Sequence, residues 1–524
     1  MSDKYQLWGG CFSEEPSAVL RRLSDSLAVD SRLYREDIAG SRAWAAELHR
    51  SGHLTDQDNG AIQRGLVEVG KDICEELSKA GRLTDPEEDI HSVVERRLHA
   101  HAGAAALRLH TARSRNDQSA TDTRLWMLVA LPTLEDALKQ LVEVLLKRAT
   151  DELDIIAPGY THLQRAQPIR WSHFLLSYAW SLRDDVTRLE EQKERLSRCP
   201  LGSGAIAGCA LPIDRARLAR TLGFQDITPN SMFAVSSRDH IVEFLNWAAL
   251  CGLHLSRLSE DLIIYSSQEF GIVRFSDQFS TGSSLMPQKR NPDGLELVRG
   301  SAGLLLGDSF SFGCVLKGLP STYNKDLQSD KEILFRAHDR LLDCLKVTTG
   351  TICTMEVNGP RALSSLEPGM LATDLAHALV RRGVPFRSAH HLVGAALRRA
   401  AELSVDLRGL PHAEYIAISP EFGPEKELAA LFSWEASVEQ YTSAGGTARA
   451  AVLRQLELLR GWLRRAPACL PTPYIRNIHA LYDGYRANMG GGIIVGTKYR
   501  AWKRNADFIN SLLAIPKGLN EAGR

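Results

Sequence analysis

The sequence predicts a mostly α-helical protein built around a bundle of long helices. Apolar residues recur at steps of three and four over long stretches without proline, which is the pattern of a helix face. Strand signals are sparse, and neither βα alternation nor a phosphate-binding glycine motif such as GxGxxG occurs. Residues 237–268 are the clearest helix, because they contain a single glycine and are apolar on several sides, as in helices buried within a large assembly.

The same periodicity places three more helices. A second long helix contains residues 134–145, and Pro132 is expected to begin or kink it. A third long helix starts within residues 292–305, directly after an Asn-Pro pair. A shorter helix at 373–382 is expected to stop at Gly383, with a proline two residues further on.

The composition is that of a folded globular protein. The 524 residues are 44% apolar and 24% charged, and 63 basic residues balance 63 acidic ones. Such a composition excludes global disorder, which goes with few apolar residues and a large net charge. A protein that coats nucleic acid would carry a basic excess, so the balanced charge argues against nucleic acid as a partner.

The sequence also indicates the compartment. No stretch approaches the roughly 18 apolar residues of a membrane-spanning helix, and residues 1–8 lack the apolar core of a signal peptide. The nine cysteines are scattered and form no CxxC pair, which argues against a zinc site and a disulfide framework. We therefore expect a cytoplasmic protein with reduced thiols, no membrane association and no metal.

These features divide the chain into four parts. We expect an N-terminal helical domain (1–112), a central long-helix bundle that carries the chemical motifs (113–361), a C-terminal helical domain (362–465) and a C-terminal extension (466–524). The extension holds eight Lys/Arg against three Asp/Glu, together with six aromatic residues. We expect it to pack on the outside of the protein; binding of nucleic acid or of an acidic partner is the alternative.

Three polar segments interrupt the helices, at residues 110–117, 158–168 and 281–292. Each adjoins a long helix and mixes hydroxyl, amide and cationic side chains with few or no acids. Arginine and lysine supply positive charge, while serine, threonine and asparagine orient a bound anion. The segments therefore suit a small dicarboxylate.

Together the segments resemble the three signature regions of the fumarase/aspartase superfamily. The third fits the G-S-x-x-M-P-x-K-x-N pattern of that superfamily at residues 282–291. Further segments make the chain similar to the argininosuccinate lyase and delta crystallin family: 7–10 (LWGG), 88–91 (EDIH), 200–205 (PLGSGA), 318–328 (GLPSTYNKDLQ) and 440–449. The resemblance runs from about Leu7 to about Arg460.

The resemblance implies a three-domain fumarase/aspartase-like fold and a homotetramer that needs no cofactor and shares each active site among three subunits. It implies a substrate in which a succinate carbon is bonded to nitrogen, and the products fumarate and arginine, as in arginine biosynthesis. Long helices that are apolar on several sides agree with such an assembly, because they need partners that one chain does not supply.

The resemblance also implies the catalytic residues. Ser283 matches the base that removes the proton beside a carboxylate, and Lys289 with Asn291 match the groups that stabilise the resulting aci-carboxylate. His162 matches the second catalytic position, and Glu296 matches its acidic partner. Whether His162 donates a proton to the leaving group or only relays charge is left open.

Other residues match binding positions. The list for the succinate end is Arg115, Asn116, Thr161 and Asn291; that for the arginine end is Tyr323, Gln328 and Lys331, with Ser26 from the N-terminal part. Asp89 and His91 lie in a segment that the family places near the site, and are expected to support it.

Three departures bear on specificity. Ala112 stands where the family usually has glycine, and Ser24 and Val29 also differ from the common residues near Ser26. If position 112 needs a positive φ, alanine there costs about 1 kcal/mol and could shift the Arg115 loop. Two alternatives therefore remain: a lyase for a different N-substituted succinate, and a non-catalytic, crystallin-like structural relative.

Overall fold

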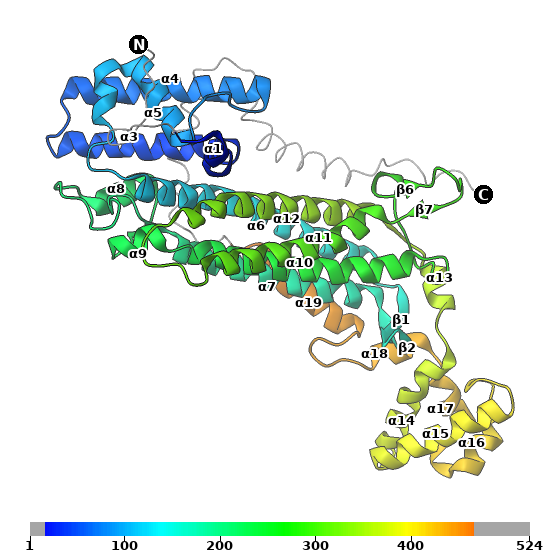
Figure 1. Cartoon of the computed structure of the whole chain (residues 1–524). Coiled ribbons are helices and arrows are strands. Elements are labelled where there is room, and N and C mark those ends of the chain that lie inside the picture. Colours follow the sequence, from blue (N-terminus) through cyan, green and yellow to red (C-terminus); the bar gives the residue numbers. More distant parts are fainter. Residues whose placement is uncertain (1–15, 466–524) are drawn as a thin grey trace, which may run out of the picture.

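A long helical bundle dominates the structure, a computed structural model that describes residues 16–465. N-terminal helices lie over one end of the bundle, and a C-terminal lobe extends from the other end (Figure 1). The extension at 466–524 and the matching segment at 7–10 lie outside the described residues. Among residues 16–465, no helix is both long and apolar enough to cross a membrane.

Five helices form the bundle, and their apolar faces meet in one core. They are α6 (Arg115–Asp151), α7 (Trp171–Leu196), α10 (Asp239–Ser266), α11 (Asp293–Leu316) and α12 (Asp330–Thr354). The long helices predicted around 237–268, 134–145 and 292–305 are thus confirmed. Pro132 lies inside α6 rather than at its start, and α7 and α12 pack against this helix and support it.

The N-terminal helices are held by local caps. They are α1 (Ala18–Ser24), α2 (Leu27–Asp30), α3 (Tyr34–Arg50), α4 (Asp56–Ala80) and α5 (Ile90–Ala102), with short 3₁₀ turns at Ser31–Leu33 and Gly103–Arg108. Asp89 begins α5 by accepting a hydrogen bond from the Ser92 backbone N–H at 2.7 Å. Gly81, at φ 71°, ends α4 in the left-handed conformation that favours glycine.

Strands are few and short, as expected. Four two-stranded sheets occur in the described residues: β1 (Ile156–Thr161) with β2 (Gln164–Arg170), β3 (Arg198–Cys199) with β4 (Asp226–Ile227), β5 (Val273–Arg274) with β8 (Glu356–Val357), and β6 (Thr281–Gly282) with β7 (Arg290–Asn291). Two helices, α8 (Arg215–Leu222) and α9 (Ser231–Ser236), and 3₁₀ turns at Asp277–Phe279 and Lys325–Ser329 complete this part.

The C-terminal lobe has a core of its own, between Leu375 and Leu428. Its elements are α13 (Gly359–Ser364), α14 (Ala372–Arg381), α15 (Phe386–Glu402), α16 (His412–Ile418), α17 (Glu425–Ala430) and α18 (Trp434–Glu439), with 3₁₀ turns at Pro368–Leu371 and Pro420–Phe422. The stop at Gly383 is confirmed, since this glycine has φ 93° just after α14. The last helix, α19 (Arg449–Leu463), returns to pack on α6 and α7, so it joins the bundle core although the sequence groups it with 362–465.

Within residues 16–465, one face of α11 is uncovered. Four large apolar side chains on this helix are exposed, at 52–75% of their surface: Leu297, Leu304, Leu306 and Phe310. Gly300, Gly303, Gly307 and Gly313 of the same helix have open space where a Cβ would be. A continuous apolar face of this kind marks a surface at which proteins associate.

Candidate active site

The first polar segment begins α6. Ser114 caps the helix by accepting a hydrogen bond from the Asn116 N–H (3.2 Å), and Asp117 returns the bond by accepting from the Ser114 N–H (3.1 Å). This capping box places Arg115 and Asn116 in the first turn of a long helix. Backbone N–H groups and the helix dipole favour an anion at such a helix start, so this turn suits a substrate carboxylate.

Asp117 ties this turn to a second loop. Its other carboxylate oxygen accepts the backbone N–H groups of Gly202 and Gly204, each at 2.9 Å. Burial raises the pKa of Asp117 to about 6, although these backbone hydrogen bonds act in the opposite direction. Ala205 follows directly, and its carbonyl accepts a long hydrogen bond of 3.5 Å from Asn116 Nδ2.

Ala112 adopts φ 57°, a left-handed conformation that favours glycine. Alanine in place of glycine at this position therefore strains the backbone. We expect Ala112→Gly to raise the free energy of unfolding by about 1 kcal/mol, because glycine adopts this conformation without strain. Thermal unfolding measures the effect. Ala120→Gly, in the interior of α6, is the matched control and should be destabilising; a destabilised Ala112→Gly would show that position 112 carries no such strain.

Several residues predicted to bind the arginine end lie at this same end of the bundle. Gln328 Nε2 donates to the Ser24 carbonyl at 2.7 Å, and Ser26 Oγ donates to buried Asp30. Lys331 is buried and its Nζ lies 2.9 Å from Asp330. Burial raises the pKa of Tyr323 to about 12, so its hydroxyl stays protonated and able to donate.

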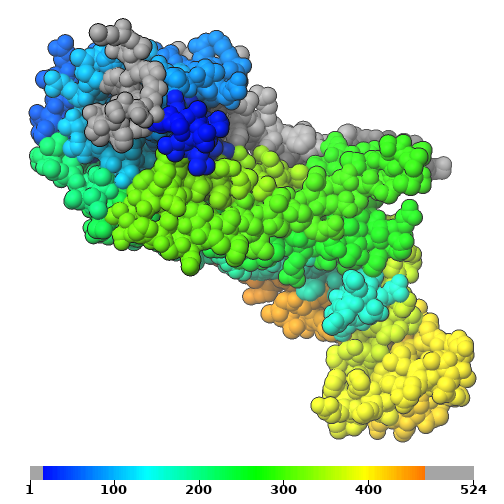
Figure 2. Space-filling view, in the orientation of Figure 1, coloured from blue at the N-terminus to red at the C-terminus, as the bar shows by residue number. Residues whose placement is uncertain are grey.

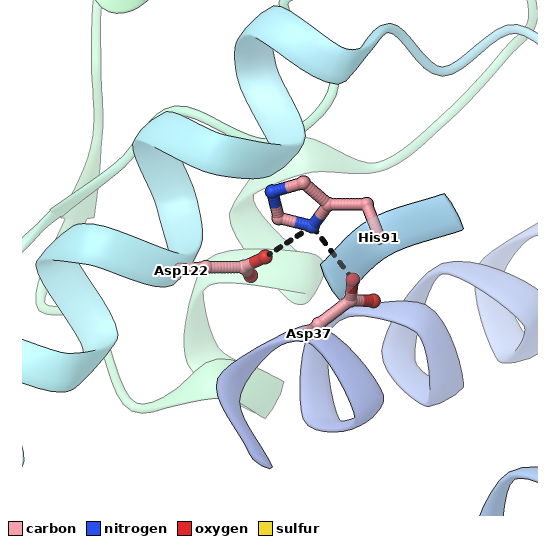
Figure 3. Close-up of side chains that lie close together, drawn as sticks. All are labelled: Asp37, His91 and Asp122. Carbon is pink, nitrogen blue, oxygen red and sulfur yellow. Dashed lines mark hydrogen bonds and ion pairs between the residues drawn. The ribbon is translucent and has the colours of Figure 1, made fainter. Parts of the chain in front are cut away.

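Two buried carboxylates, those of Asp37 and Asp122, face the same ring nitrogen of His91 (Figure 3). Its Nδ1 lies 2.7 Å from Asp37 and 3.5 Å from Asp122, and the second ring nitrogen points away from both. Ligand atoms of the three residues lie within 4.8 Å of one another, close enough for a shared cation. Positive charge is already supplied by Arg113, which donates to Ser41 (2.9 Å), which in turn donates to Asp37 (3.0 Å).

The two carboxylates differ in protonation. Burial alone would raise the pKa of Asp37, but the hydrogen bond and charge of His91 and the charge of Arg113 lower it below its ordinary value. Burial and the charge of Asp37 raise the pKa of Asp122 well above its ordinary value. The lowered pKa of Asp37 favours its ionised form, and the raised pKa of Asp122 favours its protonated form.

We expect Asp122→Asn to gain stability relative to the parent protein as pH rises from 5 to 8. Unfolded Asp122 ionises at about pH 4, whereas the raised pKa of the folded carboxyl holds its proton to higher pH, so its contribution to stability falls as pH rises. Asparagine resembles the protonated carboxyl and has no such loss. Melting temperatures across this pH range measure the difference.

Asp37→Asn is the control, because the contribution of Asp37 to stability depends on pH in the opposite direction. A lowered pKa contributes stability that is present above the unfolded value of about 4 and is lost as pH falls through the folded value. Removing this buried charge should cost about 3 kcal/mol at pH 7. If Asp122→Asn tracked the parent at every pH, Asp122 would be ionised in the folded protein.

The third polar segment forms an exposed loop, Ser283–Lys289, between the paired strands β6 and β7. The hydroxyl of half-buried Ser283 accepts the backbone N–H groups of Leu285 (3.2 Å) and Met286 (3.0 Å). Lys289 Nζ lies 2.7 Å from Asn291 Oδ1, so these two predicted groups are adjacent. Two N–H donors on one hydroxyl oxygen stabilise its alkoxide, which is what a serine base requires.

The second polar segment forms the β1–β2 hairpin, with Thr161 and His162 exposed at its tip. Its base is anchored: Gln167 donates to Tyr441 at 2.9 Å, and fully buried Arg170 pairs with Glu439 of α18. Within residues 16–465, no hydrogen bond or ion pair joins His162 to Glu296, whose nearest charged partner is Arg299 at 3.9 Å. The predicted His162–Glu296 pair does not form within one chain.

The predicted site residues thus fall into three separate groups. Arg115 and the hairpin lie at opposite ends of α6, whose 37 residues span about 55 Å at ~1.5 Å per residue. The Ser283 loop precedes α11 and Tyr323 follows it, and the 24 residues of this helix span about 36 Å. Figure 1 shows the N-terminal helices and the β6–β7 loop at opposite ends of the bundle.

Sequence reasoning missed three carboxylates that organise the site, namely Asp37, Asp117 and Asp122. For Asp117 a signal existed, because Ser114-x-x-Asp117 is a capping-box pattern. Asp37 and Asp122 lie on apolar helix faces, and only their common contact with His91 in space reveals them.

Known proteins identify the family. A family model described as lyase matches residues 10–307, and one described as argininosuccinate lyase C-terminal matches residues 369–439. The argininosuccinate lyase of Roseiflexus castenholzii is 48% identical over 86% of this chain and 98% of its own length. A probable argininosuccinate lyase of Schizosaccharomyces pombe is 45% identical over 88% of this chain and 99% of its own.

Solved structures agree with the fold. EDDS lyase in complex with formate matches with a TM-score of 0.74 and 25% identity, over 90% of this chain and 95% of its own. A class II fumarase from Schistosoma mansoni matches with a TM-score of 0.65 and 17% identity, over 80% of this chain and 92% of its own. The mostly α, fumarase/aspartase-like fold is confirmed, and the chain belongs to the argininosuccinate lyase family of the fumarase/aspartase superfamily.

Proposed function

We propose that the protein is a carbon–nitrogen lyase that cleaves argininosuccinate into arginine and fumarate. The observation that carries the proposal is the Ser283 loop: a hydroxyl with two backbone N–H donors, followed by Lys289 beside Asn291. The relatives of 45–48% identity that cover nearly the whole described chain support the substrate.

The reaction is a β-elimination. Ser283 removes a proton from the carbon beside one carboxylate, and the electron pair moves into that carboxylate, which then carries about two negative charges. Lys289 and Asn291 are placed to stabilise this aci-carboxylate. The pair then forms the double bond of fumarate, and the nitrogen leaves as the guanidine of arginine.

His162 acts at the leaving group of the reaction. The leaving nitrogen belongs to a guanidinium that is already protonated, so it needs less help from a general acid than a simple amine does. We propose that His162, with Glu296 from another subunit, stabilises and relays charge at this stage.

We propose a homotetramer in which three subunits build each site. The support is geometric: the group around Arg115 and Tyr323 lies tens of ångströms from the hairpin along α6 and from the Ser283 loop along α11. The exposed apolar face of α11 offers a surface for association. The free thiols of the described cysteines suit a reducing compartment such as the cytoplasm.

Steady-state absorbance of fumarate tests the function, with argininosuccinate and then adenylosuccinate as substrates. Turnover of argininosuccinate alone supports the proposal. Turnover of another N-substituted succinate would assign a different amine specificity, and inactivity with both would favour a structural relative.

Mixed subunits test the shared site. We expect Ser283→Ala and Arg115→Ala proteins to be inactive alone, and to regain part of the parent turnover when they are denatured and refolded together. Some mixed sites then take Ser283 and Arg115 from unmutated copies. Light scattering should report a tetramer throughout; a fully active monomer, or mixtures without recovery, would overturn the shared site.

A further inference from the structure

The tip of the β1–β2 hairpin has an unfavourable backbone. Thr161 pairs with Gln164, which leaves His162 and Leu163 as a two-residue turn. Both turn residues are left-handed, with φ 55° and 57°. Two-residue turns of this kind are normally built from Asn-Gly or Gly-Gly, because other residues pay a steric cost in this conformation.

Within residues 16–465, the Leu163 side chain remains mostly exposed. It is 67% exposed, although leucine has no polar group that would stabilise the left-handed conformation locally. Glycine at position 163 would relieve the strain, so the backbone alone does not account for leucine. Burial of a leucine side chain against another surface would offset the strain.

A second copy of this chain is the surface that the structure offers. The hairpin lies between the bundle and the C-terminal lobe (Figure 2), where Arg165 pairs with Glu367 while the tip residues 161–164 stay exposed. The residue beside Leu163 is His162, whose predicted partner Glu296 forms no hydrogen bond or ion pair with it within residues 16–465. The uncovered apolar face of α11 likewise indicates that copies of the chain associate.

We propose that Leu163 is a positioning residue whose side chain docks on a neighbouring subunit and thereby fixes the direction in which His162 faces the shared site. This inference rests on the proposed function for its catalytic part. The hairpin base is held by its own chain through Gln167 and Arg170, and Leu163 holds the tip to the neighbour. The side chains of His162 and Leu163 are both exposed at this left-handed tip.

Three substitutions at position 163 distinguish the effect of the side chain from that of the backbone conformation. Leu163→Gly and Leu163→Asn suit a left-handed turn, so their melting temperatures should equal or exceed that of the parent protein. Their kcat should nevertheless fall by about tenfold to a hundredfold, because small misplacements of a catalytic group have effects of this size. Leu163→Met keeps an apolar side chain and should retain most of the kcat.

Leu403→Asn is the matched control, because Leu403 is 41% exposed in the C-terminal lobe and should tolerate the change without loss of kcat. An unchanged kcat in Leu163→Asn would overturn the proposal. A parallel fall of melting temperature and kcat would also overturn it, since that pattern means general destabilisation.

A covalent readout does not depend on turnover. With p-benzoylphenylalanine at position 163 of the full chain, illumination should give a cross-linked dimer on a denaturing gel. Its absence would overturn the docking of Leu163. If the cross-link forms while the parent protein fails to cleave argininosuccinate, the proposed function fails and the subunit contact stands.

Discussion

Replacing Ser283 with alanine is expected to lower turnover by a factor of roughly 10²–10⁴, the usual contribution of a positioned proton acceptor. The hydroxyl of Ser283 accepts two backbone N–H groups of its own loop, which stabilises the alkoxide needed to remove a weakly acidic proton. Alanine leaves these donors in place and removes only the base. The proposed tetramer should persist, because the loop is exposed and contributes no residue to the hydrophobic core.

Ser284→Ala is the matched control for this substitution. Its hydroxyl lies in the same loop and is exposed, so its loss should leave turnover near the parent value. Fumarate absorbance gives kcat for both proteins, and light scattering checks the assembly. Near-normal turnover in Ser283→Ala would remove Ser283 from the role of base.

The long helices were predictable because their signal is local. Apolar residues at steps of three and four mark a buried face irrespective of what it packs against, and α10 and α11 begin within two residues of the expected positions. Pro132 shows the limit of local rules. Proline ordinarily starts or breaks a helix, but neighbouring helices hold α6 continuous through it.

The course of α19 was not predictable in the same way. Its amphipathic pattern predicts a helix but does not say which surface covers its apolar face. The face made by Val452, Leu456 and Leu459 lies in the bundle core and not in that of the C-terminal lobe. Distant packing decides such a case, and periodicity carries no information about it.

The sequence predicts the site as a set of residues and does not predict its geometry. The motif residues were found through a family resemblance, which says nothing of how far apart they lie in one chain. No sequence motif marks the carboxylates around His91. The role of an aspartate on an apolar helix face can be recognised only when the structure shows the histidine that it contacts. The sequence shows that Ala112 replaces the glycine usual in the family. The positive φ at this position shows that the replacement costs backbone strain.

Replacing Lys289 with methionine is expected to lower kcat by a factor of roughly 10² or more, the usual effect of removing one preorganised donor to a developing oxyanion. Lys289 Nζ lies beside Asn291 Oδ1 at 2.7 Å, so the ammonium group is already oriented before substrate binds. Methionine has a similar length and no charge, which limits the change to electrostatics.

The split between kcat and KM distinguishes two roles for Lys289. The second negative charge of the aci-carboxylate exists only near the transition state, so a lysine that stabilises it affects kcat far more than KM. Arg290→Met is the matched control, because Arg290 is the next cation in the chain and pairs with Asp277 at the surface; its kcat should change much less. An effect of Lys289→Met confined to KM would mean that Lys289 binds the ground-state carboxylate, and the stabilisation of the aci-carboxylate would then fall to Asn291 and the loop N–H groups.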